Sequence, residues 1–539
     1  PGPTCPDVES VDTVAQGYAF LRGTVLATAV TDPRGNTTVH RFNNFGSLIE
    51  RVDALGQSTR FERADGTNLL LSTTDPLGRV TRFTYDANGN VISITDPADH
   101  GRTFTYEPTF SQVTSMTNPL GNVTRFEYDG RGNLTASVDP LGNRTTMSYN
   151  AFGQPVSTTD PLRNTTAFAY DTVGNLTTVT DPLGNITTRT YDAVSRLIGQ
   201  TDPRGLATRF AYDPLNRLVQ STDARAGATD FTYDGNGNLL TVTDGRGNTT
   251  SHSYDRMDRL ASRTDPVRAT ETFAYDLGGN LIQHIDRKAQ EATFSYDALN
   301  RRTAARYTDG TTTTFAHDAT GRLIAATDSV GGSLENMYDA LDRLVAQTTA
   351  LGTVSYQYDP LGRRTRMDAP DQAPVFYDYD AASRLRAITQ APLNPVTIDY
   401  DALGRRSLLT LPNGVSTEYQ YDRGSRLAAL VYRNALGLLG DLTYQYDPAG
   451  NRTRVGGSFA RTLLPDPVST ASYDAANRQL TFGDKTMTFD ANGNLTSMAD
   501  PSGLSTFTWD ARNGLVVLTG PGVSASFQYD PLGRRFRKT

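Results

Sequence analysis

Apolar and polar residues alternate along most of this chain, in short segments of about six residues rich in Thr, Val, Phe and Tyr. Phe210 and Tyr212 stand two residues apart, as do Phe273 and Tyr275, so each pair would lie on one face of a β-strand. No window of about 11 residues or more shows the period of an amphipathic helix. The pattern predicts an all-β protein built from short strands.

The aromatic residues that end these segments recur at a fixed spacing. From Tyr128 to Tyr338 there are ten successive intervals of 21 residues, usually marked by Tyr-Asp. The phase extends upstream to Phe42 and downstream to Tyr529, which gives 24 phased positions, 19 of them tyrosine. A fixed period of this length indicates a repeat architecture.

Each repeat contains two turn signals, which we call the first turn and the second turn. In the repeat that begins at Tyr170 they are residues 171–175 (Asp-Thr-Val-Gly-Asn) and 181–185 (Asp-Pro-Leu-Gly-Asn). The residue four places after the phased position should need a left-handed backbone, which favours Gly, Asn or Asp. That position holds Gly 13 times and Asn or Asp six times in 24 repeats. The exceptions are Thr67, Phe110, Ser195, Ser383 and Ser425.

Each repeat is therefore predicted to be one β-hairpin, and consecutive hairpins should pair into a continuous antiparallel sheet. The phased tyrosines would form a ladder of cross-strand aromatic contacts. About 24 hairpins give about 48 strands, and at ~4.8 Å per strand the sheet would be ~230 Å long. Open twisted sheets rarely exceed ~10 strands without curling. We therefore expect a ribbon that spirals into a hollow shell or cocoon rather than a filled core.

Composition agrees with a wall one sheet thick, because hydrophobic residues are only 37% of the 539. The net charge of -7 gives no global reason to bind nucleic acid. Cys5 is the single cysteine, which excludes an internal disulfide framework. No apolar run approaches the roughly 18 residues of a membrane span. Of the 51 basic residues all but Lys288, Lys485 and Lys538 are arginine, a bias for which the repeat itself gives no reason.

No motif of an enzyme active site is evident. The five histidines are scattered without a metal-ligand spacing, and we find neither a G-x-S-x-G elbow nor a P-loop. His317 occupies a phased position and is interpreted as a substitute for tyrosine. Residues 234–238 (Asp-Gly-Asn-Gly-Asn) resemble a calcium loop but lack its closing Glu. We expect no catalytic residue, no cofactor and no metal.

The pattern Tyr-Asp-x-x-Gly-x-Leu followed by Asp-Pro-Leu-Gly-Asn resembles the YD repeat of the Rhs family, over residues 31–539. That family includes bacterial Rhs polymorphic toxins, shell-forming components of insecticidal toxin complexes, and teneurins. The resemblance implies a cocoon of spiralling hairpins around a C-terminal toxin, secreted or at the bacterial cell surface. It further implies that a self-cleaving core and the toxin follow Thr539, and that plug or secretion-system components are partners.

The phase divides the chain into three parts. Residues 1–30 form an irregular lead-in, and residues 31–430 form the regular ribbon. Residues 431–539 hold repeats with spacings of 25, 27, 16 and 20, so we expect longer loops near residues 436–442 and 455–469.

Arginine replaces the usual leucine six residues after the phased position in five repeats, all in the second half of the chain. On one interpretation their stems lie over aromatic rings with the charged heads in water. On the other they line the lumen and contact an enclosed polypeptide. The five are Arg302, Arg364, Arg406, Arg452 and Arg535.

Together these observations favour a non-enzymatic scaffold that encloses and protects its own C-terminal toxin. An alternative from another class is an extracellular adhesion module, in which exposed Tyr and Asn rows bind a carbohydrate or a receptor. A self-cleaving enzyme is the third hypothesis, with its chemistry beyond Thr539. Neither nucleic acid nor a membrane span is expected among the partners.

Overall fold

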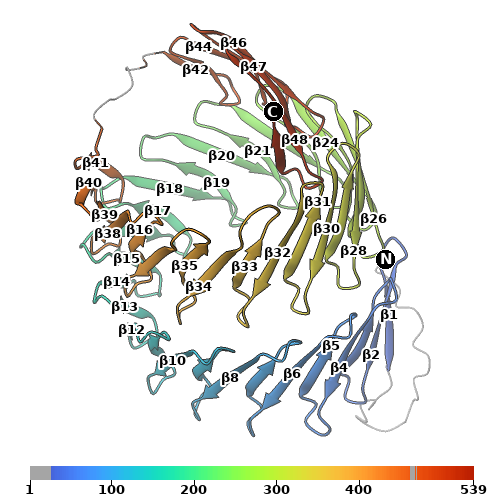
Figure 1. The fold of residues 1–539 in the computed structure, drawn as a ribbon, viewed down its shortest axis with the longest axis vertical. Helices are drawn as coiled ribbons and strands as arrows, with labels where there is room; N and C mark the ends of the chain where they lie inside the picture. Colours follow the sequence, from blue (N-terminus) through green and yellow to red (C-terminus); the bar gives the residue numbers. More distant parts are fainter. Residues whose placement is uncertain (1–25, 462–467, 469) are drawn as a thin grey trace. The chain divides into compact units, whose positions relative to one another are not determined.

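The computed structural model describes residues 26–461, 468 and 470–539, which form 49 strands and no helix. Strands β1–β41 belong to one 41-stranded sheet, and β42–β49 to an eight-stranded sheet (Figure 1). Two strands per repeat predict nearly this number. The all-β hairpin prediction is therefore confirmed. Cys5 and most of the predicted lead-in lie outside the described residues.

The strands follow one another in chain order. The bounds of the first half are β1 Ala27–Thr31, β2 Thr37–Phe42, β3 Leu48–Val52, β4 Ser58–Arg63, β5 Leu70–Thr74, β6 Val80–Tyr85, β7 Val91–Thr95, β8 Gly101–Tyr106, β9 Val113–Thr117, β10 Val123–Tyr128, β11 Leu134–Val138, β12 Arg144–Tyr149, β13 Pro155–Thr159, β14 Thr165–Tyr170, β15 Leu176–Thr180, β16 Ile186–Tyr191, β17 Leu197–Thr201, β18 Ala207–Tyr212, β19 Leu218–Thr222, β20 Ala228–Tyr233, β21 Leu239–Thr243, β22 Thr249–Tyr254, β23 Leu260–Thr264, β24 Thr270–Tyr275 and β25 Leu281–Ile285.

The bounds of the second half are β26 Glu291–Tyr296, β27 Arg302–Tyr307, β28 Thr312–His317, β29 Leu323–Asp328, β30 Gly332–Tyr338, β31 Leu344–Thr349, β32 Gly352–Tyr358, β33 Arg364–Asp368, β34 Val375–Tyr379, β35 Leu385–Gln390, β36 Val396–Tyr400, β37 Arg406–Thr410, β38 Ser416–Tyr421, β39 Leu427–Asn434, β40 Gly437–Tyr446, β41 Arg452–Gly456, β42 Ala471–Tyr473, β43 Gln479–Phe482, β44 Lys485–Phe489, β45 Leu495–Asp500, β46 Gly503–Trp509, β47 Leu515–Gly520, β48 Val523–Tyr529 and β49 Arg535–Lys538.

The phased residue ends the strand before every first turn, and the pairing shifts there. In β14 and β15 the partners run in register up to Ala169, opposite Thr178, and then Tyr170 pairs with Leu176. The same shift occurs before Tyr191 and Trp509. The extra residue is a β-bulge, which bends the strand and raises its local twist.

The first turns have the backbone that the sequence predicts. The residue four places after the phased position has a positive φ in 22 of the 24 repeats, including Ser195, Ser383 and Ser425 at φ 63–65. In the remaining two repeats the loop is one residue longer, and the left-handed residues are Asn68 and Ser111. Thr67 and Phe110 are thus explained by a one-residue displacement rather than by a different turn.

The interaction that recurs at the phased tyrosines is a hydroxyl-to-backbone ladder rather than the ring-to-ring ladder we expected. The hydroxyl of Tyr149 donates to the carbonyl of Leu134 (2.8 Å), and Tyr400 donates to Leu385 (2.7 Å). Trp509 does the same through its Nε1, to Leu495 (2.7 Å). Each ring therefore ties its hairpin to the first strand residue of the preceding repeat.

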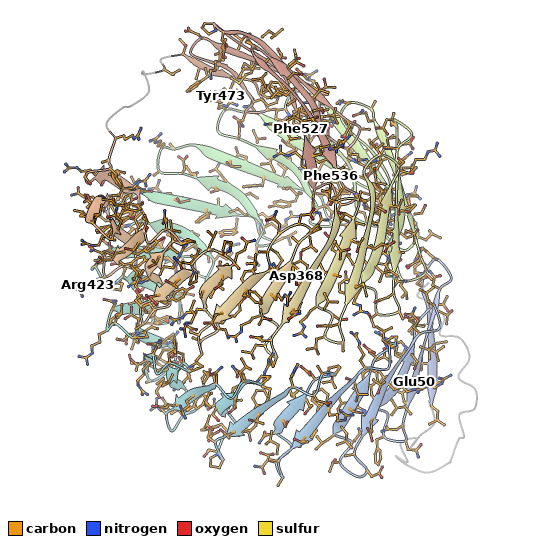
Figure 2. The ribbon with its side chains drawn as sticks, viewed as in Figure 1. Glu50, Asp368, Arg423, Tyr473, Phe527 and Phe536 are labelled. Carbon is orange, nitrogen blue, oxygen red and sulfur yellow. The ribbon has the colours of Figure 1, made fainter. Side chains whose placement is uncertain are left out.

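Few side chains are buried, as expected of a sheet one layer thick. The apolar side chains buried among the described residues are five alanines together with Leu334 and Phe527. Side chains project from both faces of the strands (Figure 2). Hydrogen bonds and ion pairs at the turns must therefore supply much of what a large apolar core supplies elsewhere.

The chain divides into two compact units. Unit 1 comprises Pro1–Phe104, Glu271–Ser355 and Met487–Thr539, and unit 2 comprises Thr105–Thr270 and Tyr356–Thr486. Each unit therefore brings together stretches of ribbon that are far apart in sequence.

The wider spacing after Tyr421 lengthens the strands and not the turn, so the longer loop expected near residues 436–442 is wrong: residues 437–442 belong to β40. β39 has 8 residues and β40 has 10, and they meet in a tight turn at residues 435–436. Residues 462–467 and 469, within the second predicted loop, lie outside the described residues.

Candidate functional site

Arginine stands five residues after the phased position in 12 of the 24 repeats, and each of these pairs with the aspartate four residues before it. Arg322, for example, donates from Nε to Asp318 Oδ2 (2.6 Å). Its Nη1 also donates to the carbonyl of Asp339 in the next repeat (3.1 Å). We call these residues the clamp arginines: Arg196, Arg217, Arg259, Arg301, Arg322, Arg343, Arg363, Arg384, Arg405, Arg426, Arg478 and Arg534.

At least seven clamp arginines also stack on the phased tyrosine of the next repeat. Their guanidinium carbons lie 4.2–5.1 Å from the ring centroids, as for Arg322 over Tyr338 and Arg405 over Tyr421. A planar guanidinium can stack and donate along two directions at once, whereas an ammonium cannot. The clamp thus explains part of the preference for arginine over lysine.

A second set of contacts joins stretches of ribbon that are far apart in sequence. In both units the second turns of an earlier stretch contact the first turns of a later one, and we call this contact the seam. In unit 1 Arg34, in the second turn after β1, donates to the carbonyl of Asp297 (2.8 Å), 263 residues away. It also pairs with Asp276 (3.7 Å).

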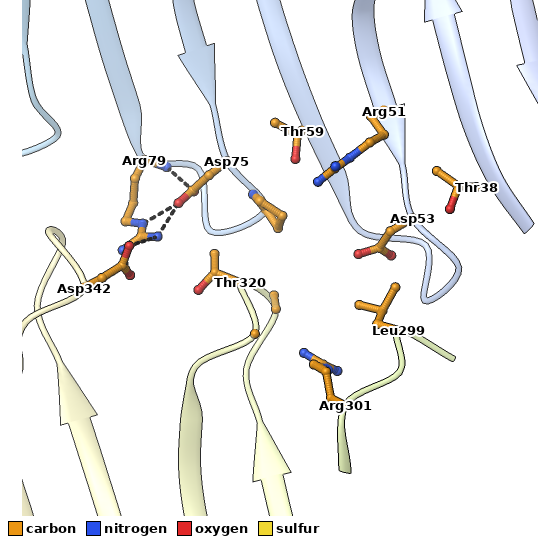
Figure 3. A pocket seen from close by; sticks show the side chains of 13 residues that line it. Thr38, Arg51, Asp53, Thr59, Asp75, Arg79, Leu299, Arg301, Thr320 and Asp342 are labelled. Carbon is orange, nitrogen blue, oxygen red and sulfur yellow. Dashed lines mark hydrogen bonds and ion pairs between the residues drawn. The ribbon is translucent and has the colours of Figure 1, made fainter. Parts of the chain in front are cut away.

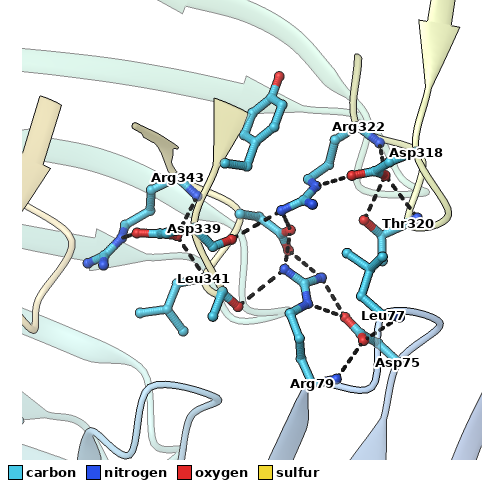
Figure 4. A network of polar contacts seen from close by, with 12 residues as sticks. Asp75, Leu77, Arg79, Asp318, Thr320, Arg322, Asp339, Leu341 and Arg343 are labelled. Atoms are coloured by element: carbon cyan, nitrogen blue, oxygen red, sulfur yellow. Dashed lines mark hydrogen bonds and ion pairs between the residues drawn. The ribbon is translucent and has the colours of Figure 1, made fainter. Parts of the chain in front are cut away.

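Arg79 makes the corresponding contact after β5 (Figure 4). It binds Asp75 of its own turn and donates from Nη1 to Asp342 Oδ1 at 2.6 Å, again 263 residues away. Asp342 also accepts a bond from the clamp residue Arg322 (2.9 Å). The clamp and the seam therefore share one carboxylate.

The charges in this network stabilise one another. Burial would raise the pKa of Asp75, but hydrogen bonds and charge from Arg79 outweigh it and hold that pKa below its usual value. Burial would likewise raise the pKa values of Asp318 and Asp339, but hydrogen bonds from their clamp arginines outweigh it and lower both pKa values. These carboxyls stay ionised near neutral pH.

A polar pocket of about 550 Å³ opens on this part of the seam (Figure 3). Arg51, Asp53 and Thr59 line it from the earlier stretch, and Leu299 and Arg301 from the later one. The carboxylate of Asp53 accepts the backbone N–H groups of Leu55 and Gln57 at 2.9 Å, so it caps its own turn. The lining offers charge pairing and hydrogen bonding, with no nucleophile held by a base.

Further along unit 1 the seam rests on a buried aspartate. Asp328, 4% exposed, accepts bonds from Thr313 Oγ1 (2.7 Å) and from Arg512 Nη1 (2.5 Å), which is 184 residues away. Arg512 also lies over the ring of Tyr307. Burial opposes ionisation of Asp328, but the bonds from Thr313, Gly331 and Arg512 lower its pKa overall.

Unit 2 has its own seam with the same polarity. Arg204 pairs with Asp447 (3.3 Å), and Arg246 donates to the carbonyl of Asp474 (3.1 Å). Leu183 packs so closely that a Cβ on Gly424 would lie 2.7 Å from its Cδ1. Every one of these contacts runs from a second turn to a first turn.

The five arginines singled out in the sequence are divided between the two units, with Arg302 and Arg535 in unit 1 and the other three in unit 2. Each lies over an aromatic ring of its own or the preceding repeat, with the guanidinium carbon 4.2–5.5 Å from the ring centroid. Arg364 is half-buried, and Arg302, Arg406, Arg452 and Arg535 are exposed. The guanidinium heads, which the first interpretation placed in water, stack on the rings, and contact with a cargo stays a proposal.

The other sequence candidates serve the repeat. His317 ends β28 and pairs with Leu323, as the phased tyrosines pair with their leucines, and burial lowers its pKa. The Asp234 carboxylate accepts bonds from its own turn, at the N–H groups of Asn236 and Asn238. Within the described ranges no group of three or more His, Cys, Asp or Glu side chains is placed to hold a metal.

The clamp and seam residues were not identified from the sequence. The clamp had a readable signal, because Arg or Asn fills the fifth place after the phased position in 20 of 24 repeats. The seam had none, because its partners are 184 to 263 residues apart. No described helix is long and apolar enough to cross a membrane.

Two protein-family models match this chain. The RHS repeat model matches residues 64–100, 110–144, 128–165, 149–186, 170–205, 338–374, 400–436 and 489–522, and the teneurin YD-shell model matches residues 206–338. No curated protein sequence matches the chain.

Solved structures share the fold at low identity. The crystal structure of TcdB2-TccC3-Cdc42 superposes with a TM-score of 0.70 at 13% identity, over 93% of this chain and 39% of that one. TcdB2-TccC3 gives 0.68 at 14%, over 93% and 37%. The Tc holotoxin pore of Photorhabdus luminescens gives 0.56 at 13%, over 94% and 37%. This chain thus spans less than two-fifths of their length. With its repeat model, its YD-shell match and this fold, the chain belongs to the Rhs/YD-repeat family.

Proposed function

We propose that this chain is the wall of a shell that encloses and protects a polypeptide toxin. The wall acts as a non-enzymatic scaffold of a secreted or surface-exposed bacterial protein. The observation that carries the proposal is the seam. A ribbon one layer thick, joined edge to edge by ion pairs between distant turns, makes a continuous barrier without needing a filled core.

The cargo would be the segment that follows the repeats. One of the structures with this fold is described as TcdB2-TccC3 without its hypervariable C-terminal region, so that protein carries a variable segment at its C-terminus. By analogy we place the toxin of this protein after Thr539. Arg302, Arg364, Arg406, Arg452 and Arg535 remain our candidates for contacting it, through the faces of their guanidinium groups that the aromatic rings leave free.

Protease protection tests enclosure directly. An unstructured polypeptide with many cleavage sites is fused after Thr539, and its digestion is followed in the native protein. We expect the cargo to survive when the wall is intact, and to be cut in the double variant Arg79→Ala, Asp342→Ala, which removes one seam contact.

Arg131→Ala is the matched control. Arg131 is an exposed first-turn arginine whose side chain donates to the carbonyl of Ala151 in the next repeat, so it does not contribute to the seam. Electron microscopy of the fusion provides the second readout. Cargo cut at the same rate in the wild-type wall as in the free peptide, or a particle without a lumen, would contradict the proposal and favour an adhesion module.

A further inference from the structure

Unit 2 contains two stretches of ribbon, one on each side of its seam. The seam joins the second turns of the earlier stretch (Thr105–Thr270) to the first turns of the later stretch (Tyr356–Thr486). The first turns of the earlier stretch and the second turns of the later stretch therefore remain outside this seam. One is a first-turn edge and the other is a second-turn edge, which are the two kinds of edge that meet in the seam.

The first-turn edge of the earlier stretch is apolar where the turn projects farthest. The residue three places after the phased position is Phe152 (89% exposed), Val173 (76%), Val194 (66%) and Leu215 (66%) in four successive repeats. Successive first turns are two strands apart, about 10 Å, so these side chains form a row ~30 Å long. In the later stretch the same position holds Leu361 and Leu403, which are half-buried.

The second-turn edge of the later stretch is also apolar. Leu393 is 59% exposed and Leu436 is 96% exposed. The equivalent Leu183 of the earlier stretch, which contacts Gly424 across the seam, is 38% exposed. Exposed apolar rows of this kind mark interaction surfaces.

We propose that a second copy of this chain docks on the row formed by Phe152, Val173, Val194 and Leu215, through its own second-turn edge at Leu393 and Leu436. As in the seam, second turns of one stretch would contact first turns of another, here between two molecules. The later second turns, at residues 369–374, 391–395, 411–415 and 435–436, contain no arginine, so this contact is more apolar than the internal seam. Because the two edges differ, the contact is heterologous and addition does not stop at a dimer.

Sedimentation velocity over a range of protein concentrations tests the proposal, and two edge variants sharpen it. The first-edge variant is Phe152→Asn, Val194→Asn, Leu215→Asn, and asparagine fits because Asn88 and Asn236 occupy this position in other repeats. The second-edge variant is Leu393→Asn, Leu436→Asn. Ile186→Asn, Ile198→Asn changes exposed apolar side chains on strands of the same unit and is the control.

We expect the wild-type protein and the control to form species that grow with concentration, and each edge variant to associate at least about tenfold more weakly. A mixture of the two edge variants should form dimers and nothing larger, because each molecule keeps one intact edge. Circular dichroism confirms that each variant is folded. A wild-type protein that stays monomeric at all concentrations, or association that the variants leave unchanged, overturns the proposal.

Discussion

Two regions of the ribbon repeat the same hairpin but hold it differently. Around residues 128–175 the fifth place after the phased position is asparagine or, at Gln154, glutamine, and the Asn133 and Asn175 side chains bond to the aspartate of their own turn at 2.9 Å. Around residues 317–380 it is arginine, and Arg322 and Arg363 also reach the carbonyl of the next repeat. At Asn133 and Asn175 this side chain closes only its own turn, whereas Arg322 and Arg363 also couple their turns to the next repeat.

The comparison teaches that a repeat protein can vary its stiffness without changing its fold. In a linear array, stability is the sum of what each repeat contributes and of what neighbours contribute to each other. Exchanging asparagine for arginine changes the second contribution while the left-handed turn residue and the phased tyrosine stay as they are. The predictions below break or sharpen this difference, beginning with the largest effect.

Removing a clamp arginine should cost more than removing the corresponding asparagine. Arg322→Ala leaves the partly buried Asp318 without its partner and also loses the bond to Asp339, for about 2–3 kcal/mol. Asn133→Ala should cost about 1 kcal/mol. Hydrogen exchange of the two neighbouring hairpins measures both, and equal losses in the two variants would refute the distinction.

Acid should reduce the difference between the two regions. The folded pKa values of Asp318 and Asp339 lie below the ordinary 3.8, so the stability these groups contribute is complete above that value. It is lost as the pH falls through the lower folded values, because the protonated acid no longer pairs with arginine. Asp129 and Asp171 also have lowered pKa values, caused mainly by hydrogen bonds from Asn133 and Asn175.

Because a protonated acid retains part of its hydrogen bonding to an amide but loses its ion pair, the arginine region should lose more of its protection. Hydrogen exchange at pH 7 and at pH 3, corrected for intrinsic rates, checks this. A protection difference that widens in acid would count against the ion pairs as its source.

Lysine should replace a clamp arginine only in part. Arg363→Lys can keep the charge pair with Asp359, but it loses the directed bond to the Asp380 carbonyl and the stacking over Tyr379. We expect a loss of about 1 kcal/mol. Thermal unfolding compares it with Arg363→Ala, which should be worse. A lysine variant as stable as wild type would show that charge alone is sufficient.

Restoring the tyrosine at the one phased histidine should stabilise the ribbon slightly. His317→Tyr places a hydroxyl where the other phased tyrosines donate to a carbonyl 15 residues earlier, here that of Arg302. The gain should be about 0.5–1 kcal/mol. Tyr296→Phe, which removes the same bond from the preceding repeat, should show a loss of similar size; if neither variant shifts the melting temperature, the hydroxyl ladder contributes little.

The repeat could be predicted from the sequence because everything that defines a hairpin lies within 21 residues. The left-handed backbone of the first turn favours Gly or Asn, as at Gly174 and Asn216. The alternation of side chains along a strand places Phe210 and Tyr212 on one face. What the tyrosines do was harder to foresee, because an aromatic residue in register suggests ring contacts as readily as a hydroxyl bond. The arginine bias acquired a reason only when the next turn was seen in three dimensions.

The seam could not be predicted in the same way. The turns that contain Arg79 and Asp342 have ordinary compositions, and nothing in either sequence indicates that the two turns meet. Their meeting depends on how much each of the intervening hairpins bends and twists, which single residues do not encode. Asp328 and Arg512 meet for the same reason over a shorter span of chain.

The hydroxyl ladder reaches back only 14 to 19 residues, and this bears on how the molecule is made. Contacts that are close in sequence form early, and chains fold while they are still being synthesised. Each hairpin can therefore settle against its predecessor soon after it leaves the ribosome, one repeat at a time. The seam must wait until roughly 184 to 263 more residues have been translated. Anything encoded downstream of the last repeat would then emerge when the wall is already largely built.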